Sequence, residues 1–270
     1  MNSPRDFVKE ICDEEGIALD ILSHGYVLRL TKNDTSRQVF GSYWDLNSAA
    51  ADRIACDKTA CYSLLRSSQI PAIPHVLMFN PQRRAGWSGE EGTWTRALHY
   101  FEANNQKMVV KPNQGTKGES VYYCDSIPAL EAAVQAIFMT QPDAALSPYQ
   151  EIETEYRVFY LNGKCRYAYG KTKGDSWQHN LSQGATAFEI SKSTPEDKKK
   201  LARLENLASR AASCIGINFA TIDIAESAEE KLEIMEINSG VQARQLLEQL
   251  PHLQDTIKQI YADAINSMWP

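Results

Sequence analysis

The amino-acid sequence predicts an α+β fold. Apolar stretches are split by tight turns around Asn33–Asp34 and at Asn162–Gly163, which is typical of β-hairpins. Residues 194–217 show the apolar periodicity of an amphipathic helix. Strands and helices do not follow the regular βαβ alternation of a parallel, doubly wound sheet, and this leaves a mixed α+β architecture.

Capping and turn signals divide the first half of the chain. Gly16 closes a short helix within 6–19, Ser48 caps a helical stretch at 47–70, and Pro128 lies in the first turn of a helix at 126–140. The other predicted segments are a hairpin at 26–40, a proline-marked strand at 70–79, a loop and short helix at 80–104, and a strand–loop–strand unit at 107–124.

The second half opens with a long β region at 147–173, which contains the Asn162–Gly163 turn. Thr194 caps the helix at 194–217, and Pro195 occupies its first position. A second hairpin at 221–238 and a terminal helix at 256–268 complete the predicted elements.

Composition excludes several classes of protein. The chain has 270 residues, a net charge of −6 and 43% hydrophobic residues, which argues against nucleic-acid binding as its main role. No apolar run is long enough for a membrane span, and the N-terminus lacks the apolar core of a signal peptide, so a cytoplasmic location is expected. The six cysteines and five histidines are dispersed, which predicts reduced thiols and no zinc site.

The segment TIDIAESAEEKLEIMEIN, residues 221–238, places acidic side chains inside an apolar hairpin. With a turn centred between Glu229 and Glu230, Asp223 pairs with Glu236, and Asn238 lies on the same face. Carboxylates that close repel each other unless a cation lies between them, and Mg²⁺ prefers such oxygen ligands. A polar, solvent-facing side of a hairpin explains the same pattern, and both interpretations stay open at this point.

Two further segments carry lysines. In VVKPNQGTKGESVYY, Lys111 ends an apolar strand and a loop with Gly115 and Gly118 follows, which suits phosphate binding. The loop matches neither a Walker A nor a GxGxxG motif, so an ordinary hairpin is the alternative. Lys58 lies in the helical segment ACDKTACYSLL, where a solvated surface lysine is the simple explanation.

The stretch YQEIETEYRVFY predicts one polar strand face. Glu151, Glu153, Glu155 and Arg157 alternate with apolar residues, so this face offers a carboxylate for ribose and an arginine for phosphate or carboxylate. An acidic, solvent-facing strand is the alternative. Downstream, Lys171 and Lys173 precede a loop with Asn180 and Gly184, and a mobile surface loop explains that pattern equally well.

Taken in order, these motifs resemble the ATP-grasp superfamily. The resemblance covers about 47–265 and lies in DK, VVKPNQGTKGESV, EYR, NLSQGA and EIMEINSG. It is greatest to the carboxylate–amine ligases, such as glutathione synthetase, cyanophycin synthetase and the ribosomal-protein glutamate ligases. It implies an ATP-grasp fold with two α+β lobes gripping ATP between antiparallel sheets: a short N-terminal region at 1–46, an N-terminal lobe at 47–146 with the phosphate lid, and a C-terminal lobe at 147–270 with the metal site.

The resemblance also implies residue roles. ATP phosphates would be held by the two lysines and covered by the glycine loop, adenine would meet the strand edge, a glutamate would bind ribose, and two Mg²⁺ ions, replaceable by Mn²⁺, would bridge the phosphates. The residues in that order are Lys58 and Lys111; Gly115, Gly118 and Ser120; Gln150, Glu151 and Ile152; Glu155; and Asp223, Glu236 and Asn238. Catalytic positions would be Arg157, Lys173 and Asn180, and substrate would meet Lys171 and Arg244.

The implied activity is ATP-dependent ligation of a small carboxylate to an amine, an amino acid or a peptide, through an acylphosphate. A phosphotransferase or an ATP-binding regulatory module are the alternatives. The expected partners are these small molecules, without nucleic acid or membrane, and a homodimer is left open. The short N-terminal region and the SGVQAR sequence after Asn238 depart from the family pattern. Loops 80–104 and 171–190, with Trp87, Trp94 and Trp177, are candidates for the acceptor pocket.

Overall fold

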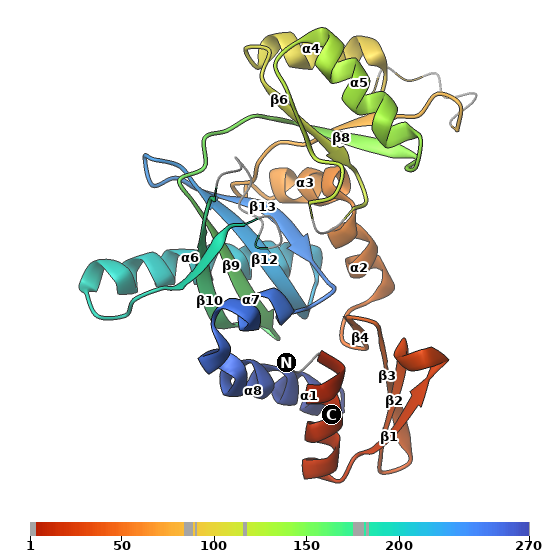
Figure 1. The fold of residues 1–270 in the computed structure, drawn as a ribbon, viewed down its shortest axis with the longest axis vertical. Coiled ribbons are helices and arrows are strands. Elements are labelled where there is room, and N and C mark those ends of the chain that lie inside the picture. The colour runs from red at the N-terminus through yellow and green to blue at the C-terminus, as the bar shows by residue number, and fades with distance from the viewer. Residues whose placement is uncertain are drawn as a thin grey trace.

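The computed structural model describes residues 4–83, 89, 91–115, 118–174, 181 and 184–269. Three sheets are stacked along its long axis, with sheet C at the top, sheet B in the middle and sheet A at the bottom of Figure 1. Neighbouring strands within these sheets pair antiparallel. Helices pack against each sheet, so the predicted α+β class is confirmed.

Sheet A has the strand order β1-β2-β3-β4 and contains the first predicted hairpin, whose turn holds Asn33 and Asp34 at positive φ. The first helix ends at Glu15, and residues that the sequence assigned to its end form β1 instead. Gly16, at φ +67°, allows this reversal. The elements are α1 (Pro4–Glu15), β1 (Ala18–Leu22), a 3-10 turn (Ser23–Gly25), β2 (Val27–Lys32), β3 (Thr35–Phe40) and β4 (Tyr43–Trp44).

Sheet C has the strand order β5-β8-β6-β7, with α4 and α5 packed on one face. Met108, Val110 and Leu146 lie on that face and are fully buried against the helices. The opposite face is left to the interior of the molecule between sheets C and B. The elements are β5 (Val76–Phe79), α4 (Trp94–Ala103), β6 (Met108–Pro112), β7 (Tyr122–Cys124), α5 (Ile127–Phe138) and β8 (Asp143–Pro148).

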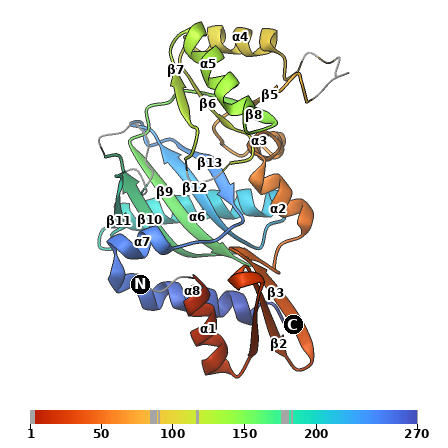
Figure 2. The ribbon, with the colours of Figure 1, turned by 45° about the vertical axis from the view of Figure 1, so that its right-hand side comes forward.

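Sheet B has the strand order β11-β10-β9-β12-β13 and two different faces. One face packs on α6, α2 and α3 (Figure 2), and the lower part of the other packs on α7, α8 and the sheet A region. The sequence left α7 and β11 unassigned. The elements are α2 (Ala49–Cys56), α3 (Lys58–Ser67), β9 (Thr154–Leu161), β10 (Lys164–Thr172), β11 (Thr186–Glu189), α6 (Pro195–Ile215), β12 (Phe219–Glu226), β13 (Leu232–Asn238), α7 (Arg244–Gln249), a 3-10 turn (Pro251–Leu253) and α8 (Gln254–Asn266).

The predicted helical stretch at 47–70 is broken into α2 and α3 at Asp57. This residue leaves the helical region (φ −102°, ψ 105°), and its side chain accepts a hydrogen bond from the Ala60 backbone N–H at 2.9 Å. It therefore caps a new helix, as aspartate commonly does. The break makes Lys58 the first residue of α3 rather than a residue in the middle of a solvated helix.

Two details of sheet B correct the predicted strand faces. Strand β9 begins at Thr154, so Glu151 and Glu153 lie before it and do not share a strand face with Glu155. In the last hairpin Asp223 pairs with Glu236 as predicted, but the register shifts between Asp223 and Ile224. This bulge separates Glu236 from Leu232 and Ile234, which were predicted to share its face and are buried in the core under α6.

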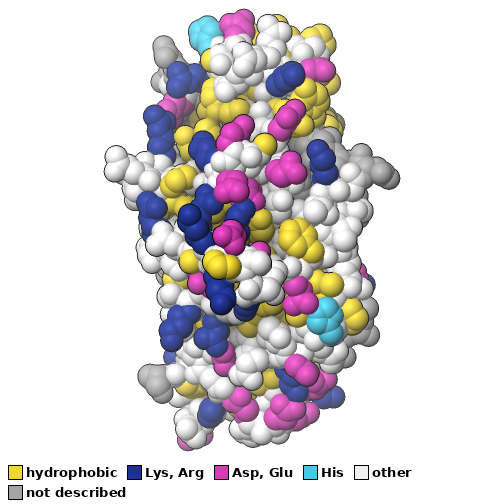
Figure 3. All heavy atoms as spheres, turned by 90° about the vertical axis from the view of Figure 1, so that its left-hand side faces the viewer, with side chains coloured by type: hydrophobic (Ala, Val, Ile, Leu, Met, Phe, Trp, Pro, Cys, Tyr) yellow, Lys and Arg dark blue, Asp and Glu magenta, His cyan; other side chains and the backbone are white. Residues whose placement is uncertain are grey.

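The predicted boundaries of the three regions stay a prediction, although α2 and α3, from the 47–146 range, contribute Ala51, Cys61 and Leu65 to the core of sheet B. None of the helices in the described part of the chain is long and apolar enough to cross a membrane. On the surface shown in Figure 3, Lys and Arg side chains gather at mid-height with Asp and Glu among them.

Candidate functional site

Residues of four strands form three rows of side chains on the face of sheet B opposite α6. The register fixes these rows, because side chains of paired residues in adjacent strands project from the same face. The rows are Lys171–Glu155, Arg157–Asp223–Glu236 and Thr221–Asn238. Asp223, Glu236 and Asn238, predicted from the sequence to converge, therefore lie together, and Glu155, Arg157 and Lys171 lie beside them.

Asp223 is the centre of an ion-paired network. The Arg157 guanidinium donates to both of its carboxylate oxygens, from Nε at 2.7 Å and from Nη2 at 2.6 Å. Lys171 Nζ donates to Oδ1 at 3.3 Å, and Asn238 Nδ2 donates to Oδ2 at 3.1 Å. Burial acts to raise the pKa of Asp223, but Arg157 and Lys171 outweigh it and hold this pKa well below its usual range. The carboxylate is therefore ionised at neutral pH.

Lys171 and Glu155 form a second buried ion pair in the same network. Lys171 Nζ donates to Glu155 Oε1, and the two residues are only 3% and 6% exposed. Burial raises the pKa of Glu155 to about 7, against the opposing effect of Lys171. The roles predicted for Glu155 in ribose binding and for Lys171 in substrate binding stay predictions, and in this structure the two side chains bind each other.

Glu236 links sheet B to helix α3. Its carboxylate Oε1 lies 3.4 Å from Lys58 Nζ, and Lys58 Nζ also donates to the Gly115 backbone oxygen at 2.8 Å. Lys58 is buried, with 6% of its surface exposed. A lysine at the start of α3 therefore joins the predicted metal ligand Glu236 to the glycine loop after β6, which a solvated surface lysine does not do.

The start of α3 is fastened to that loop by hydrogen bonds. The Lys58 N–H donates to the Asn113 backbone oxygen at 3.2 Å, and the Thr59 N–H donates to the Asn113 side-chain oxygen at 3.2 Å. Asp57 accepts from Gln114 Nε2 at 3.3 Å. Although burial raises the pKa of Asp57, hydrogen bonds from Ala60, Asn113, Gln114 and Thr59 lower it overall. This clip fixes the position of Lys58.

Lys111 represents sheet C in the site. It pairs with Ala145 on β8 and projects from the face of sheet C that α4 and α5 do not cover. Partly buried, it makes no hydrogen bond or ion pair with any residue that the structure describes. Burial lowers its pKa from 10.5 to about 8, Glu236 acts to raise it, and Lys58 lowers it further. Within the described part of the chain, this cation thus has no directly bound counter-charge.

The chemistry of Asp223, Glu236 and Asn238 fits a divalent metal. Two carboxylates and an amide are the oxygen donors that Mg²⁺ prefers. Both oxygens of Asp223 accept hydrogen bonds from Arg157, so a metal at this point exchanges at least one of these contacts. Among the described residues, no three His, Cys, Asp or Glu side chains cluster as a metal site requires. The predicted triad supplies only two such side chains with Asn238.

The other predicted site residues are spread around this centre or lie away from it. Gly118 and Ser120 have positive φ in the turn after the glycine loop. Gln150–Ile152 lies between β8 and β9, and Lys173 directly follows β10. Arg244 begins α7 as an exposed residue and pairs with Glu248 at 2.9 Å, so the structure does not bring it to the ion-paired network. Trp94 packs against the sheet C core. Asn180, Trp87 and Trp177 lie outside the described residues.

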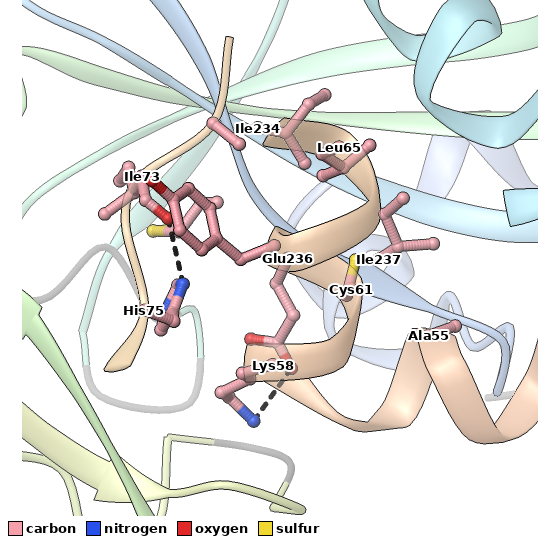
Figure 4. A pocket seen from close by; sticks show the side chains of 12 residues that line it. Ala55, Lys58, Cys61, Leu65, Ile73, His75, Ile234, Glu236 and Ile237 are labelled. Atoms are coloured by element: carbon pink, nitrogen blue, oxygen red, sulfur yellow. Dashed lines mark hydrogen bonds and ion pairs between the residues drawn. The ribbon is translucent and has the colours of Figure 1, made fainter. Parts of the chain in front are cut away.

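Sequence reasoning missed two residues beside the site. His75, 6% exposed, lines a pocket with Lys58 and Glu236 (Figure 4). Asn113 is 2% exposed and forms the clip to α3. A His after a Pro at a strand entry carries no specific signal, whereas the Asn that follows Lys111–Pro112 was within the recognised motif. Its buried polar side chain explains why the motif needs a residue that both donates and accepts.

A family model described as an ATP-grasp domain, family 3 of its clade, matches residues 72–244. The chain is also similar to two proteins named "Probable alpha-L-glutamate ligase". Over 140 residues it is 30% identical to the one from Stutzerimonas stutzeri (strain A1501), and over 136 residues it is 32% identical to the one from Azotobacter vinelandii (strain DJ / ATCC BAA-1303). These matches cover 51% and 49% of this chain but only 44% and 42% of the relatives, so the chain spans less than half the length of the curated relatives it matches.

Solved structures of low sequence identity have a similar fold. The D-alanine–D-alanine ligase from Bacillus anthracis complexed with ATP has a TM-score of 0.60 at 14% identity, over 82% of this chain and 70% of that chain. A bifunctional glutathione synthetase from Pasteurella multocida has a TM-score of 0.57 at 13% identity, over 96% of this chain and 44% of that chain. At these identities the likeness shows a shared fold and nothing about substrates.

Proposed function

The chain belongs to this family of ATP-grasp domains, and we propose that it is an ATP-dependent ligase that joins a carboxylate to an amine. One observation carries the proposal. Lys58, Lys111 and the carboxylates of Asp223 and Glu236 come from three separate parts of the chain, and they meet on facing surfaces of sheets B and C. Cations next to ionised carboxylates suit a bound nucleoside triphosphate and its metal.

In this proposal the chain holds ATP between sheets C and B. Lys58 and Lys111 bind the α- and β-phosphates, and the glycine loop from Gly115 to Ser120 covers them. The strand edge at Gln150–Ile152 meets adenine, and Glu155 is proposed for the ribose hydroxyls. The clip between Asn113 and α3 supports this assignment, because it positions Lys58 before any nucleotide binds.

Asp223, Glu236 and Asn238 are proposed to hold Mg²⁺, up to two ions, with Mn²⁺ as a substitute. When bound, the metal neutralises phosphate charge and orients the transferred group. Arg157 then keeps a bidentate donor beside the γ-phosphate position, and Lys173 and Asn180 are proposed to act there as well. The low pKa of Asp223 supports the assignment, because a metal ligand has to be deprotonated.

The proposed chemistry has two steps. A carboxylate oxygen of the acid attacks the γ-phosphorus, the bond to ADP breaks, and an acylphosphate forms. The amine then attacks the acyl carbon, inorganic phosphate leaves, and the amine loses a proton as the amide forms. No nucleophilic side chain of the protein is consumed, so the contribution of the chain is to position substrates, neutralise charge and exclude water.

We propose an amino acid or a peptide as the substrate. The names of the two bacterial relatives refer to glutamate ligation, so L-glutamate is the first candidate for the acid or the amine. Lys171 and the more distant Arg244 were assigned to substrate from the family resemblance. The buried position of Lys171 makes Lys173 and Arg244 the better candidates for a substrate carboxylate.

An ADP-release assay tests this function. Purified protein is incubated with Mg-ATP and a matrix of amino acids and dipeptides, supplied singly and in pairs, and products are identified by mass spectrometry. The expected result is ADP release that requires both an acid and an amine and that yields a product lighter than their sum by one water. A phosphorylated product that forms without an amine would instead identify a phosphotransferase. Binding of Mg-ATP without ADP release under any pair would identify a binding module.

A further inference from the structure

His75 occupies the crossing between the two sheets of the site. Before it, the chain pairs with the edge of β13: the Ile73 N–H donates to the Ile234 oxygen, and the Ile234 N–H donates to the Pro71 oxygen, both at 2.9 Å. Directly after it, β5 begins at Val76 in sheet C. The imidazole therefore lies at a junction that connects sheet B to sheet C.

The hydrogen bonding of His75 determines its chemical form. Nδ1 lies 2.9 Å from the Ile73 backbone oxygen, and a carbonyl oxygen only accepts, so Nδ1 carries the proton. Burial, with the nearby charges of Lys111 and Lys58, holds the pKa of His75 well below its usual value and keeps the ring neutral. Nε2 is consequently a bare acceptor. It is buried and has no hydrogen-bond partner among the described residues.

The pocket beside His75 already contains one ion pair. It has an empty volume of about 260 Å³ and lies between α3, β13 and the 71–75 crossing. Figure 4 shows Lys58 and Glu236 at one end of it and His75 near them. Lys58 Nζ and Glu236 Oε1 are 3.4 Å apart, longer than a direct hydrogen bond of good geometry. Most of the remaining wall is apolar, from residues such as Leu65 and Ile234.

We propose that this pocket binds one ordered water that joins His75 Nε2 to the Lys58–Glu236 ion pair. Water matches the three groups, since it donates one hydrogen to Nε2 and one to the Glu236 carboxylate and accepts from the Lys58 ammonium. An ammonium ion has no lone pair for Lys58, and an anion has no hydrogen for Nε2 or Glu236. A buried water typically makes about three hydrogen bonds to otherwise unpaired polar groups, which is the number found here.

The water makes His75 a positioning residue. Glu236 is a proposed metal ligand and Lys58 a proposed phosphate ligand, so His75 supports both through one bridge; in this respect the inference rests on the proposed nucleotide site. Partners in this outer position orient a metal-binding carboxylate, and their removal typically weakens metal binding about 10- to 100-fold. The same support is expected for Mg-ADP binding.

Two variants of His75 and a control test the bridge. His75→Leu removes both ring nitrogens, whereas His75→Gln keeps a donor for Ile73 and an acceptor for water. Tyr62→Phe changes the aromatic neighbour of His75, whose ring centroid lies 6.4 Å away, without touching Nε2. Mg-ADP affinity is measured by calorimetry, without acid or amine. The ring nitrogens of the wild-type protein are assigned by ¹⁵N NMR, and a high-resolution crystal structure locates ordered water.

The expected result is a loss of Mg-ADP affinity of about tenfold in His75→Leu. His75→Gln should lie within about threefold of wild type, because a water-mediated bond tolerates a change of acceptor, and Tyr62→Phe should bind as wild type does. NMR should show Nδ1 protonated and Nε2 bare, and the crystal structure should show water at Nε2.

Three outcomes overturn the bridge: equal affinity in wild type and His75→Leu, equal loss in the Leu and Gln variants, or a protein side chain bonded directly to Nε2. A wild-type protein that binds no Mg-ADP overturns the positioning role. A protein that binds Mg-ADP tightly but forms no amide refutes the ligase and leaves the bridge standing.

Discussion

The two sheet faces that meet at the site treat charge in opposite ways. On sheet B, Asp223, Arg157, Lys171 and Glu155 are bonded to one another before any ligand is present. On sheet C, Lys111 projects beside the small Ala145 and has no hydrogen bond or ion pair to any described residue. One face is neutralised within the protein, and the other presents a cation.

This difference suggests a division of labour. Paired charges on sheet B are part of the folded core, so removing one leaves its partners buried without compensation. The lone cation on sheet C destabilises the fold by its desolvation, and an anion bound from solution relieves that cost. Substitutions on sheet B should therefore be seen first in stability and those on sheet C first in affinity for nucleotide.

The largest effect is expected from Asp223→Ala. This change strands the Arg157 guanidinium and the Lys171 ammonium, and breaking a buried ion pair from one side typically costs about 3–5 kcal/mol of unfolding free energy. Urea denaturation followed by circular dichroism measures it. The control is Asp20→Ala, which breaks the exposed pair with Arg29 at 2.7 Å and should cost about 1 kcal/mol or less. Similar losses in the two variants would mean that the network on sheet B is not structural.

Glu236→Gln sharpens the comparison, because Glu236 lies where the two faces meet. The substitution keeps the shape of the side chain and removes a charge that the proposed metal and Lys58 both need. Turnover should fall on the order of a thousandfold while the chain stays folded. Glu233→Gln, on the same strand and paired with the exposed Lys231, is the control and should keep normal turnover. Near-normal activity in Glu236→Gln would remove this residue from the metal site.

The hairpin of sheet B illustrates what sequence reasoning could reach. Counting back from a turn between Glu229 and Glu230 predicts the pairing of Asp223 with Glu236, and the structure has that pair. The intermediate steps differ, since Glu226 pairs with Leu232 and the bulge supplies the missing offset. A bulge depends on how both strands pack against α6 and on the partner strand β9, and the alternation of residues within one strand does not encode it.

The charge network was beyond the sequence for a related reason. The alternation of Glu155 and Arg157 predicts a shared face, but which strands flank β9 is a matter of topology. Lys171 reaches Glu155 only because β10 is on one side, and Asp223 reaches Arg157 only because β12 is on the other. The break at Asp57 shows the opposite case. An Asp before Lys–Thr–Ala in a helical stretch is a capping signal that the sequence already contained.

Lys111→Met tests the sheet C side of the comparison. Losing the charged contact to phosphate should weaken ADP binding roughly tenfold to a hundredfold. The unfolding free energy at pH 7 should rise, because the folded chain no longer contains this uncompensated cation. Calorimetry and urea denaturation on the same samples give both values. Lys107→Met, an exposed lysine just before the same strand, serves as the control and should change neither. A clear loss of stability in Lys111→Met would show that the cation has a partner within the protein.

The smallest expected effect is a pH dependence that only Lys111 should produce. Its pKa is lowered from 10.5 to about 8, so between these values the unfolded chain holds a proton that the folded chain has released. Stability from this group therefore increases as pH rises from about 8 to 10.5, and the cost of the buried charge is complete below pH 8. Affinity for ADP should move the other way, since above pH 8 binding has to take up a proton, and it should fall by up to about tenfold per pH unit. Calorimetric titrations of wild type and Lys111→Met between about pH 7 and 9.5 compare the slopes. Parallel curves would assign the titration to another group and leave sheet C without its free cation.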